Sequence, residues 1–166
     1  MERLWSPWRL SYVTGSESGV SSRCIFCEAA KPGSSDEDLV VCRSAACYAI
    51  LNRYPYNNGH LMVVLNRHVA TLQAATHEEL VELISLTRHA EMALSDGYKL
   101  QGINVGINLG HPAGAGIVDH LHVHLVPRWV GDTSFMSVVG NTRVLPEELG
   151  QTASRLRPIF ERLIRG

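Results

Sequence analysis

One stretch of the chain repeats its hydrophobic residues with the period of an α-helix. Within residues 77–95 the stripe consists of Leu80, Leu83, Ile84, Thr87 and Leu94, with Glu91 at its edge. Thr76 and Glu79 have the spacing of a capping box, in which each residue binds the other's backbone N–H at the start of a helix. Gly97 is placed to end this helix, because glycine readily adopts the left-handed conformation found there.

Shorter hydrophobic runs bounded by turn residues predict strands. These runs cover residues 39–42, 47–51, 60–65, 102–109 and 120–127. An Asn-Asn-Gly turn at residues 57–59 precedes the third run. A second helix is predicted over residues 147–164, with Pro146 in its first turn and Pro158 kinking or splitting it. This order of elements predicts an α+β domain around a mainly antiparallel sheet of about five strands.

The remaining segments divide the chain into an arm and a single domain. Residues 1–23 form the predicted N-terminal arm, which is rich in serine and glycine between positions 15 and 22. Trp5, Trp8 and Tyr12 indicate that the beginning of the arm docks on a surface. Residues 31–38 form a polar loop, and no internal repeat is present. We therefore expect one domain over residues 24–166, which is long enough to bury a core.

Composition and charge exclude several classes of protein. The chain has 166 residues, 45% of them hydrophobic and 19% charged, with a formal net charge of -1. Without a basic excess, nucleic acid is not expected as the main partner. No hydrophobic run approaches the length that crosses a membrane, and the first residues lack the apolar stretch of a signal peptide. We expect a cytoplasmic protein, whose four cysteines are reduced.

The strongest chemical signal is a run of alternating histidines. His120, His122 and His124 are separated by Leu121 and Val123 and followed by Leu125. On a strand the three imidazoles share one face, roughly 7 Å apart, while the aliphatic residues face a core. Packing alone explains this poorly, because imidazole is a nucleophile, a metal ligand and a group that titrates near neutral pH. The main alternative is a metal site that uses all three histidines. Metal–nitrogen bonds are only about 2 Å long, so three side chains spaced in this way do not easily bind one ion. One of the three could still join ligands from elsewhere in the chain.

A second signal is the pair of cysteines in Cys24-Ile25-Phe26-Cys27. In a reducing compartment, Cys-x-x-Cys indicates a metal or redox site rather than a disulfide. The alternative is a buried pair of thiols with no ligand. Cys42 and Cys47 fall within predicted strands, and we interpret them as core residues.

Three motifs together resemble the histidine triad (HIT) superfamily of nucleotide hydrolases and transferases. The histidine run continues into aliphatic residues and Pro127-Arg128, as in that family. The stretch from Asn52 to His60 is similar to the family's nucleoside-binding segment. Residues 104–110, followed by a glycine-rich loop, are similar to its phosphate-side segment. Further segments resemble the branch of bacterial diadenosine tetraphosphate phosphorylases, also called ATP adenylyltransferases: Leu4-Trp5-Ser6-Pro7-Trp8-Arg9, Tyr54-Pro55-Tyr56-Asn57, Gly59-His60-Leu61-Met62-Val63-Val64, Pro127-Arg128-Trp129-Val130-Gly131-Asp132 and residues 135–146.

The resemblance implies a HIT-like fold and a covalent mechanism. His122 would attack the α-phosphorus of a bound nucleotide and form a nucleotidyl-histidine, which a second acceptor then cleaves. The catalytic residues implied are His122, His124 and His60, the last two as hydrogen-bond donors to phosphate oxygens. The substrate-binding residues implied are Asn52 for the ribose, Asn108 and the backbone of Gly114 and Gly116 for the phosphates, and also His124 and Trp129. A homodimer is also implied, with the arm or the C-terminal helix crossing to the partner.

Some members of the superfamily bind a structural zinc ion, and the resemblance carries their ligand set to Cys24, Cys27, His68 and His120. A Cys₂His₂ set leaves no open coordination position, which is typical of a structural rather than a catalytic site. No organic cofactor is expected. This assignment gives His120 a role separate from that of His122.

One departure from the family leaves the acceptor open. Relatives commonly carry glutamine or serine four residues before the first histidine of the triad, where this chain has Gly116. We therefore expect a diadenosine tetraphosphate phosphorylase, with a dinucleoside polyphosphate hydrolase or a purine nucleoside phosphoramidase as alternatives. The alternative from another class is a zinc-stabilised nucleotide-binding module with little turnover.

Overall fold

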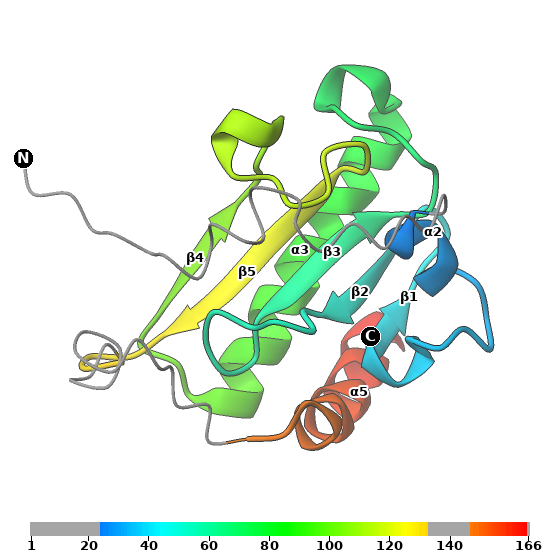
Figure 1. The fold of residues 1–166 in the computed structure, drawn as a ribbon. Helices are drawn as coiled ribbons and strands as arrows, with labels where there is room; N and C mark the ends of the chain where they lie inside the picture. Colours follow the sequence, from blue (N-terminus) through cyan, green and yellow to red (C-terminus); the bar gives the residue numbers. More distant parts are fainter. Residues whose placement is uncertain (1–23, 133–146, 166) are drawn as a thin grey trace, which may run out of the picture.

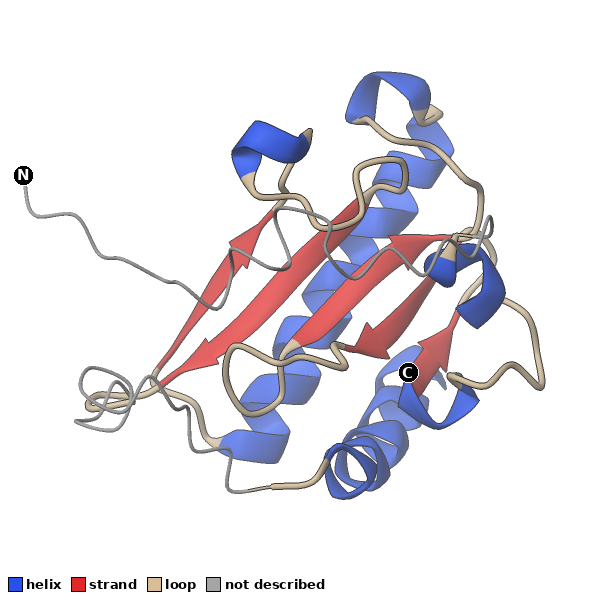
Figure 2. Cartoon of the chain, viewed as in Figure 1, coloured by secondary structure: helices blue, strands red, loops and turns tan. Residues whose placement is uncertain are grey.

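The computed structural model describes residues 24–132 and 147–165, in which one five-stranded antiparallel sheet carries the helices (Figure 2). The strands are β1 (Val40–Arg43), β2 (Cys47–Leu51), β3 (Leu61–Leu65), β4 (Gly102–Gly106) and β5 (His122–Arg128). The α-helices are α2 (Ile25–Ala29), α3 (His77–Tyr98) and α5 (Leu149–Arg165). Three short 3₁₀ turns are η1 (Glu37–Leu39), η2 (Leu72–Ala74) and η3 (His111–Ala113). The predicted α+β class and the mainly antiparallel sheet are confirmed.

The strands run side by side in the order β1-β2-β3-β5-β4, so β5 lies inside the sheet and β4 forms an edge. In the register of β3 and β5, Val64 pairs with His122 and Met62 pairs with His124. The predicted strand at residues 120–127 begins two residues late, because the Leu121 N–H donates to the Val69 carbonyl (2.6 Å) before the sheet pairing starts. The predicted strand at residues 102–109 ends at Gly106, the residue that pairs with His124.

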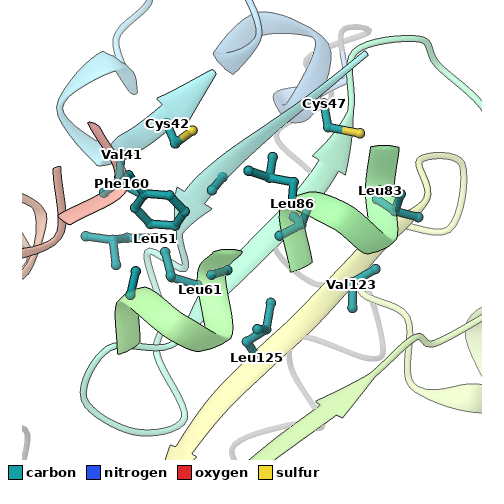
Figure 3. Close-up of a cluster of buried hydrophobic side chains, with 14 of the residues drawn as sticks. Val41, Cys42, Cys47, Leu51, Leu61, Leu83, Leu86, Val123, Leu125 and Phe160 are labelled. Carbon is teal, nitrogen blue, oxygen red and sulfur yellow. The ribbon is translucent and has the colours of Figure 1, made fainter. Parts of the chain in front are cut away.

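The alternation of side chains gives the sheet two different faces. Cys47, Ala49 and Leu51 of β2 belong to the main core, which α3 and α5 cover (Figures 1 and 3). Tyr48 and Ile50 of the same strand point to the opposite face and pack in a smaller cluster with Phe26 of α2. Cys42 and Cys47 are buried in the main core, as predicted. The sheet is therefore buried on one face by two long helices and partly covered on the other by α2.

Helix α3 begins where the sequence predicted and ends later. The Thr76 hydroxyl accepts from the Glu79 N–H, and the Glu79 carboxylate accepts from the Thr76 N–H, so the capping box is confirmed. The prediction that Gly97 stops the helix is wrong, because the helix continues to Tyr98 and Lys99 adopts the left-handed conformation. A Cβ at Gly97 would lie 3.3 Å from side-chain atoms of both Leu156 and Ile159. Glycine here therefore leaves room for the side chains of α5 that pack closely against it.

The buried stripe of α3 also differs from the predicted one. Ile84 is 62% exposed, whereas the buried residues of the helix are Leu83, Leu86, Thr87, Ala90, Ala93 and Leu94. Glu91 is exposed. The buried stripe thus includes Ala90 and Ala93, which the hydrophobic pattern did not select, and leaves out Ile84.

Helix α5 covers the outer part of the main core beside β1. Leu156 and Phe160 are 0% and 1% exposed, so this helix packs on its own chain rather than extending away from it. Of the two predicted effects of Pro158, splitting the helix is wrong, since residues 149–165 form one element, and a kink stays a prediction. Pro158 lies on the exposed side of the helix. Proline has no N–H to donate to the carbonyl one turn earlier, and on this side water can bind that carbonyl instead.

Some predictions fall outside the described residues. They are the arm at residues 1–23 with its aromatic side chains, the segment at residues 135–146 and Pro146. Among the helices that the structure describes, none is both long and apolar enough to span a bilayer.

Candidate functional site

The second and third histidines of the run lie together on the face of the sheet opposite α3. Their rings pack edge to face with centroids 4.8 Å apart. Leu121, Val123 and Leu125 point the other way into the main core, as the alternation predicted. His120 lies before the strand begins, and its ring is directed towards Cys24 and Cys27. The three histidines therefore do not form one row: two lie together on the sheet, and the first points to the two cysteines.

The hydrogen bonds of His122 define which of its nitrogens can react. Its Nδ1 lies 2.7 Å from the carbonyl oxygen of His120. A carbonyl only accepts, so Nδ1 carries the hydrogen of the neutral ring and the lone pair is on Nε2. His122 is 4% exposed, and this burial lowers the pKa of its imidazole below the ordinary value. The ring is thus held neutral at pH 7, in the form that can act as a nucleophile.

His60 and His124 form a hydrogen-bonded pair beside His122. The backbone N–H of Tyr56 donates to Nδ1 of His60 (3.1 Å), which leaves the hydrogen of a neutral His60 on Nε2. That Nε2 lies 3.0 Å from Nδ1 of His124. His124 therefore accepts through Nδ1 and, when neutral, carries its own hydrogen on Nε2. The structure brings together all three histidines predicted to be catalytic.

Of the other predicted substrate-binding residues, Asn52 lies beside His60. Asn52 follows β2, where its N–H donates to the His60 carbonyl (2.9 Å) and its side-chain oxygen accepts from the Tyr54 N–H (2.9 Å). Asn52 thus forms the local turn expected of asparagine and also borders His60. Its predicted contact with a ribose stays a prediction.

The glycine-rich loop follows β4 and contains η3. Asn108 donates from its side-chain amide to the Gly114 carbonyl at 3.4 Å. The N–H of Gly114 donates to the His111 carbonyl, and that of Ala115 donates to the Gly110 carbonyl. Within the described residues these bonds occupy two N–H groups of the predicted phosphate cradle, whereas no such bond involves the N–H of Gly116. Gly114 adopts φ 89°, a conformation that favours glycine.

Trp129 lies at the far end of β5, about 16 Å along the strand from His124 at the usual rise per residue. Its ring packs against Tyr98 with centroids 6.3 Å apart. The described ring contact of Trp129 is thus with the end of α3, and its backbone N–H and carbonyl bond Asp132. Its predicted part in substrate binding stays a prediction.

A second site gathers two cysteines and two histidines from three separate segments, around residues 24–27, 68 and 120. The ligand atoms of Cys24, Cys27, His68 and His120 all lie within 4.8 Å of one another. Nδ1 of His120 is 3.3 Å from Sγ of Cys24 and 3.6 Å from Sγ of Cys27, and Nδ1 of His68 is 3.2 Å from Sγ of Cys27. Tetrahedral zinc with its usual bond lengths separates a sulfur from a nitrogen by about 3.6 Å. The cluster therefore has the size and ligand types of a closed metal site.

The orientation of His120 fits the same interpretation. Its Nε2 lies 2.7 Å from the Leu65 carbonyl, so Nε2 carries the hydrogen and Nδ1 presents its lone pair to the cysteines. Burial lowers the pKa of this imidazole, which keeps the ring neutral as a metal ligand must be. His120 thus links the two sites, because its backbone carbonyl also fixes the tautomer of His122.

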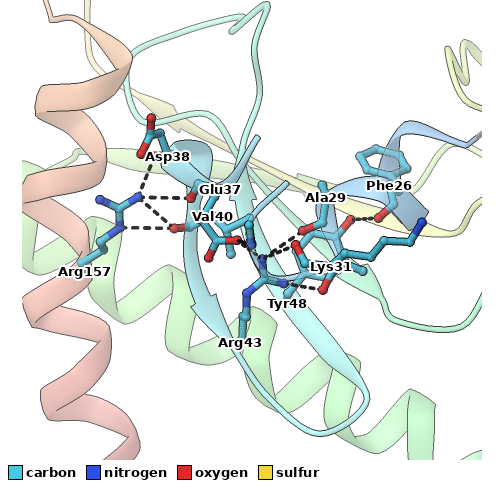
Figure 4. A network of polar contacts seen from close by, with 11 residues as sticks. Phe26, Ala29, Lys31, Glu37, Asp38, Val40, Arg43, Tyr48 and Arg157 are labelled. Carbon is cyan, nitrogen blue, oxygen red and sulfur yellow. Dashed lines mark hydrogen bonds and ion pairs between the residues drawn. The ribbon is translucent and has the colours of Figure 1, made fainter. Parts of the chain in front are cut away.

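Sequence reasoning overlooked the residues that hold α2, the helix carrying Cys27 (Figure 4). The Tyr48 hydroxyl donates to the Phe26 carbonyl at 2.7 Å. Arg43 donates to the carbonyls of Ala29 and Ala30 at the end of α2 (3.0 and 2.7 Å). The partners of this helix are distant in sequence, so nothing in the local pattern indicated these bonds. The only local indication of a role for Phe26 was its position between the two cysteines.

Comparisons with known proteins agree with this geometry. The model of the HIT domain matches residues 34–130. AP-4-A phosphorylase of Mycobacterium tuberculosis is 42% identical over 159 residues, which cover 92% of this chain and 80% of that protein. A bis(5'-nucleosyl)-tetraphosphatase (asymmetrical) of Schizosaccharomyces pombe is 33% identical over 92 residues, 55% of this chain and 50% of that protein.

Among solved structures, a Zn-bound histidine triad family protein from Mycobacterium smegmatis superimposes with a TM-score of 0.71 and 25% identity, covering 88% of this chain and 99% of that one. The family match spans more than half of the chain and includes the paired histidines of β5. The protein described here belongs to the HIT-domain family.

Proposed function

We propose that this protein is a nucleotidyltransferase that cleaves dinucleoside polyphosphates, with diadenosine tetraphosphate and inorganic phosphate as its substrates. The observation that carries the proposal is the buried, neutral imidazole of His122, whose Nδ1–H is bound by the His120 carbonyl so that Nε2 is the reacting atom. The relatives named AP-4-A phosphorylase and bis(5'-nucleosyl)-tetraphosphatase support this class of substrate.

In the first half of the reaction, the Nε2 lone pair of His122 attacks the α-phosphorus. The bond between the α-phosphorus and the oxygen that bridges it to the β-phosphate breaks, and its electron pair leaves with ATP. A phosphorus–nitrogen bond remains, which holds an adenylyl group on the histidine. The ring gains positive charge as this bond forms, and the His120 carbonyl, 2.7 Å from Nδ1, stabilises that charge.

In the second half, an oxygen of inorganic phosphate attacks the same phosphorus and the phosphorus–nitrogen bond breaks. Its electron pair returns to Nε2, and ADP is released. If water attacks instead, the product is AMP. The acceptor therefore determines whether the enzyme is a phosphorylase or a hydrolase.

The surrounding residues would orient the phosphates and stabilise their negative charge. His124 donates from Nε2 to a phosphate oxygen, and His60, whose Nε2 is directed at His124, acts through that ring. The N–H of Gly116 and the Asn108 amide bind the polyphosphate, Gly114 shapes the loop that carries them, and Asn52 binds the ribose. Trp129 contributes to substrate binding from the end of β5.

We also propose zinc at Cys24, Cys27, His68 and His120. With four protein ligands, the ion would supply no catalytic water and would instead stabilise α2 and the ring of His120. A reducing cytoplasm would keep both thiols available for this role. The substitution Cys27→Ser should lower the metal content and the stability, and should reduce activity less than His122→Ala does.

A homodimer is proposed through the edge strand β4. Its side chains are largely exposed, with Val105 50% exposed, and Leu109 in the following loop is 43% exposed. An open strand edge with apolar residues can pair with a second copy. In light scattering, Val105→Glu should yield monomers, whereas Val81→Glu, on the exposed side of α3, should leave the dimer intact.

Product analysis tests the proposed reaction. Purified protein is incubated with diadenosine tetraphosphate, with and without phosphate, and the nucleotides are separated by chromatography. Phosphorolysis predicts ADP and ATP that appear only with phosphate. AMP and ATP in plain buffer would instead identify a hydrolase, and cleavage of adenosine phosphoramidate alone would identify a phosphoramidase.

The variant His122→Ala separates an enzyme from a binding module. If His122 is the nucleophile, turnover should collapse while the affinity for nucleotide, measured by calorimetry, largely survives. Turnover that is unchanged by this substitution would contradict the covalent mechanism. A wild-type protein that binds nucleotide and turns over none of these substrates would be a nucleotide-binding module.

A further inference from the structure

Phe26, on helix α2, lies directly against the ring of the proposed nucleophile. Its ring centroid is 4.9 Å from that of His122, with the planes tilted by 47°. The same ring contacts His120 edge to face, with centroids 5.5 Å apart. Phe26 is 3% exposed, so this contact is enclosed by protein. Together with the ring of His124, Phe26 limits how far the His122 imidazole can tilt.

The segment that carries Phe26 is held firmly by the sheet. The hydroxyl of Tyr48, a fully buried residue of β2, donates to the carbonyl of Phe26 itself. Arg43, on β1, places its guanidinium against the last carbonyls of α2. Cys24 and Cys27 flank the segment and belong to the metal cluster. Figure 4 shows the bonds by which Tyr48 and Arg43 tie the Phe26 segment to the sheet.

We propose that Phe26 is a positioning residue that holds the His122 imidazole in the orientation needed for attack on phosphorus. The kinetic part of this inference rests on the proposed function. The single hydrogen bond at Nδ1 fixes one point of the ring but leaves it free to pivot about that point. The packed phenyl ring removes this freedom before substrate binds. The entropy of orienting the imidazole is therefore lost on folding and not during the reaction.

The expected effect follows from the sensitivity of group transfer to geometry. A displacement of the reacting atom by about 1 Å can lower the rate by about 100-fold. Phe26→Ala removes the ring contact, and we expect kcat to fall by about 10- to 100-fold while KM changes little. Phe26→Leu retains part of the packing volume and should recover part of the rate.

The matched control is Ile25→Ala. Ile25 precedes Phe26 in the same helix and is 52% exposed, so its removal tests α2 without the contact to His122. This variant should keep wild-type kcat and KM. Melting temperature and metal content are measured for all variants, and Phe26→Leu decides the question if Phe26→Ala does not fold.

A second readout does not depend on turnover. In nitrogen-15 NMR of the histidine rings, wild-type His122 should show the single Nδ1–H tautomer that its bond to the His120 carbonyl requires. Phe26→Ala should keep this tautomer, but nitrogen-15 relaxation should report increased motion of the His122 ring, because the ring can then pivot about its bond to the His120 carbonyl. These spectra test the role of Phe26 even if the proposed substrates are not turned over.

Loss of kcat in Phe26→Ala, partial recovery in Phe26→Leu and increased mobility of the His122 ring in Phe26→Ala would support the proposal. A raised KM with unchanged kcat would overturn it, because Phe26 would then contact substrate rather than position the nucleophile. Unchanged mobility of the His122 ring in a folded Phe26→Ala variant would also overturn it.

Discussion

The substitution His68→Ala tests the metal centre with little disturbance of the core. His68 is the exposed member of the four-residue cluster, and its Nδ1 lies 3.2 Å from Sγ of Cys27. The matched control is His77→Ala, another exposed histidine, which lies at the start of α3 and outside the cluster. Any difference between the two variants therefore reports on the metal site.

The size of the effect follows from linkage between metal binding and folding. A metal that binds only the folded protein, at a free concentration 100 times its dissociation constant, stabilises that protein by about 2.7 kcal/mol. For a chain of this length, each kcal/mol changes the melting temperature by about 2–4 °C. If three ligands no longer retain the ion, His68→Ala should lower the melting temperature by about 5–11 °C.

Elemental analysis and thermal unfolding provide the assay. Protein purified without chelator should contain about one zinc ion per chain, the occupancy of a single four-ligand site. A strong chelator should lower the melting temperature of the wild type to that of His68→Ala and should leave the variant unchanged. A metal-free wild type, or equal melting temperatures for His68→Ala and His77→Ala, would refute the assignment and leave Cys24 and Cys27 as ordinary thiols.

Two further predictions concern stability. The carboxylate of Glu79 binds Arg67 and caps α3, which lowers its pKa to about 2, so its stabilisation is present above pH 4.5 and is lost as the pH falls towards 2. In urea titrations, Glu79→Gln should therefore be less stable than wild type at pH 7 and equal to it near pH 2; an equal loss at both pH values would contradict the argument. Gly97→Leu should lower the unfolding free energy by about 1–3 kcal/mol, because the new side chain overpacks against α5. The control is Gly150→Ala, whose added Cβ would meet no neighbouring atom within 4 Å and which should be neutral or stabilising.

The sequence pattern predicted those parts of the fold that depend on residues close together in the chain. The bounds of β2 matched residues 47–51, and the capping box at Thr76 formed as expected, because alternation and capping involve neighbours in sequence. Gly97 was misread because its neighbours are Leu156 and Ile159, far along the chain. The same limit applies to Ile84, whose exposure depends on how α3 lies on the sheet.

The candidate site shows the same division. Alternation along β5 correctly separated the histidine face from Leu121, Val123 and Leu125, and the resemblance to the HIT family grouped His60 with that face. The pattern did not show that His120 turns away before the strand, since that depends on the bond from Leu121 to Val69. Nor could it place Phe26 on the ring of His122, because no local rule connects a helix at residue 26 with a strand at residue 122.

The central claim is that His122 carries the transferred nucleotide through Nε2, and covalent trapping tests it most directly. Protein is mixed with diadenosine tetraphosphate in the absence of phosphate, quenched in base to preserve the phosphorus–nitrogen bond, digested and analysed by mass spectrometry. We expect one adenylyl group on the peptide containing His122, located on that residue by fragmentation and removed as ADP when phosphate is added before the quench. Turnover without a labelled peptide, or a label on another residue, would contradict the account.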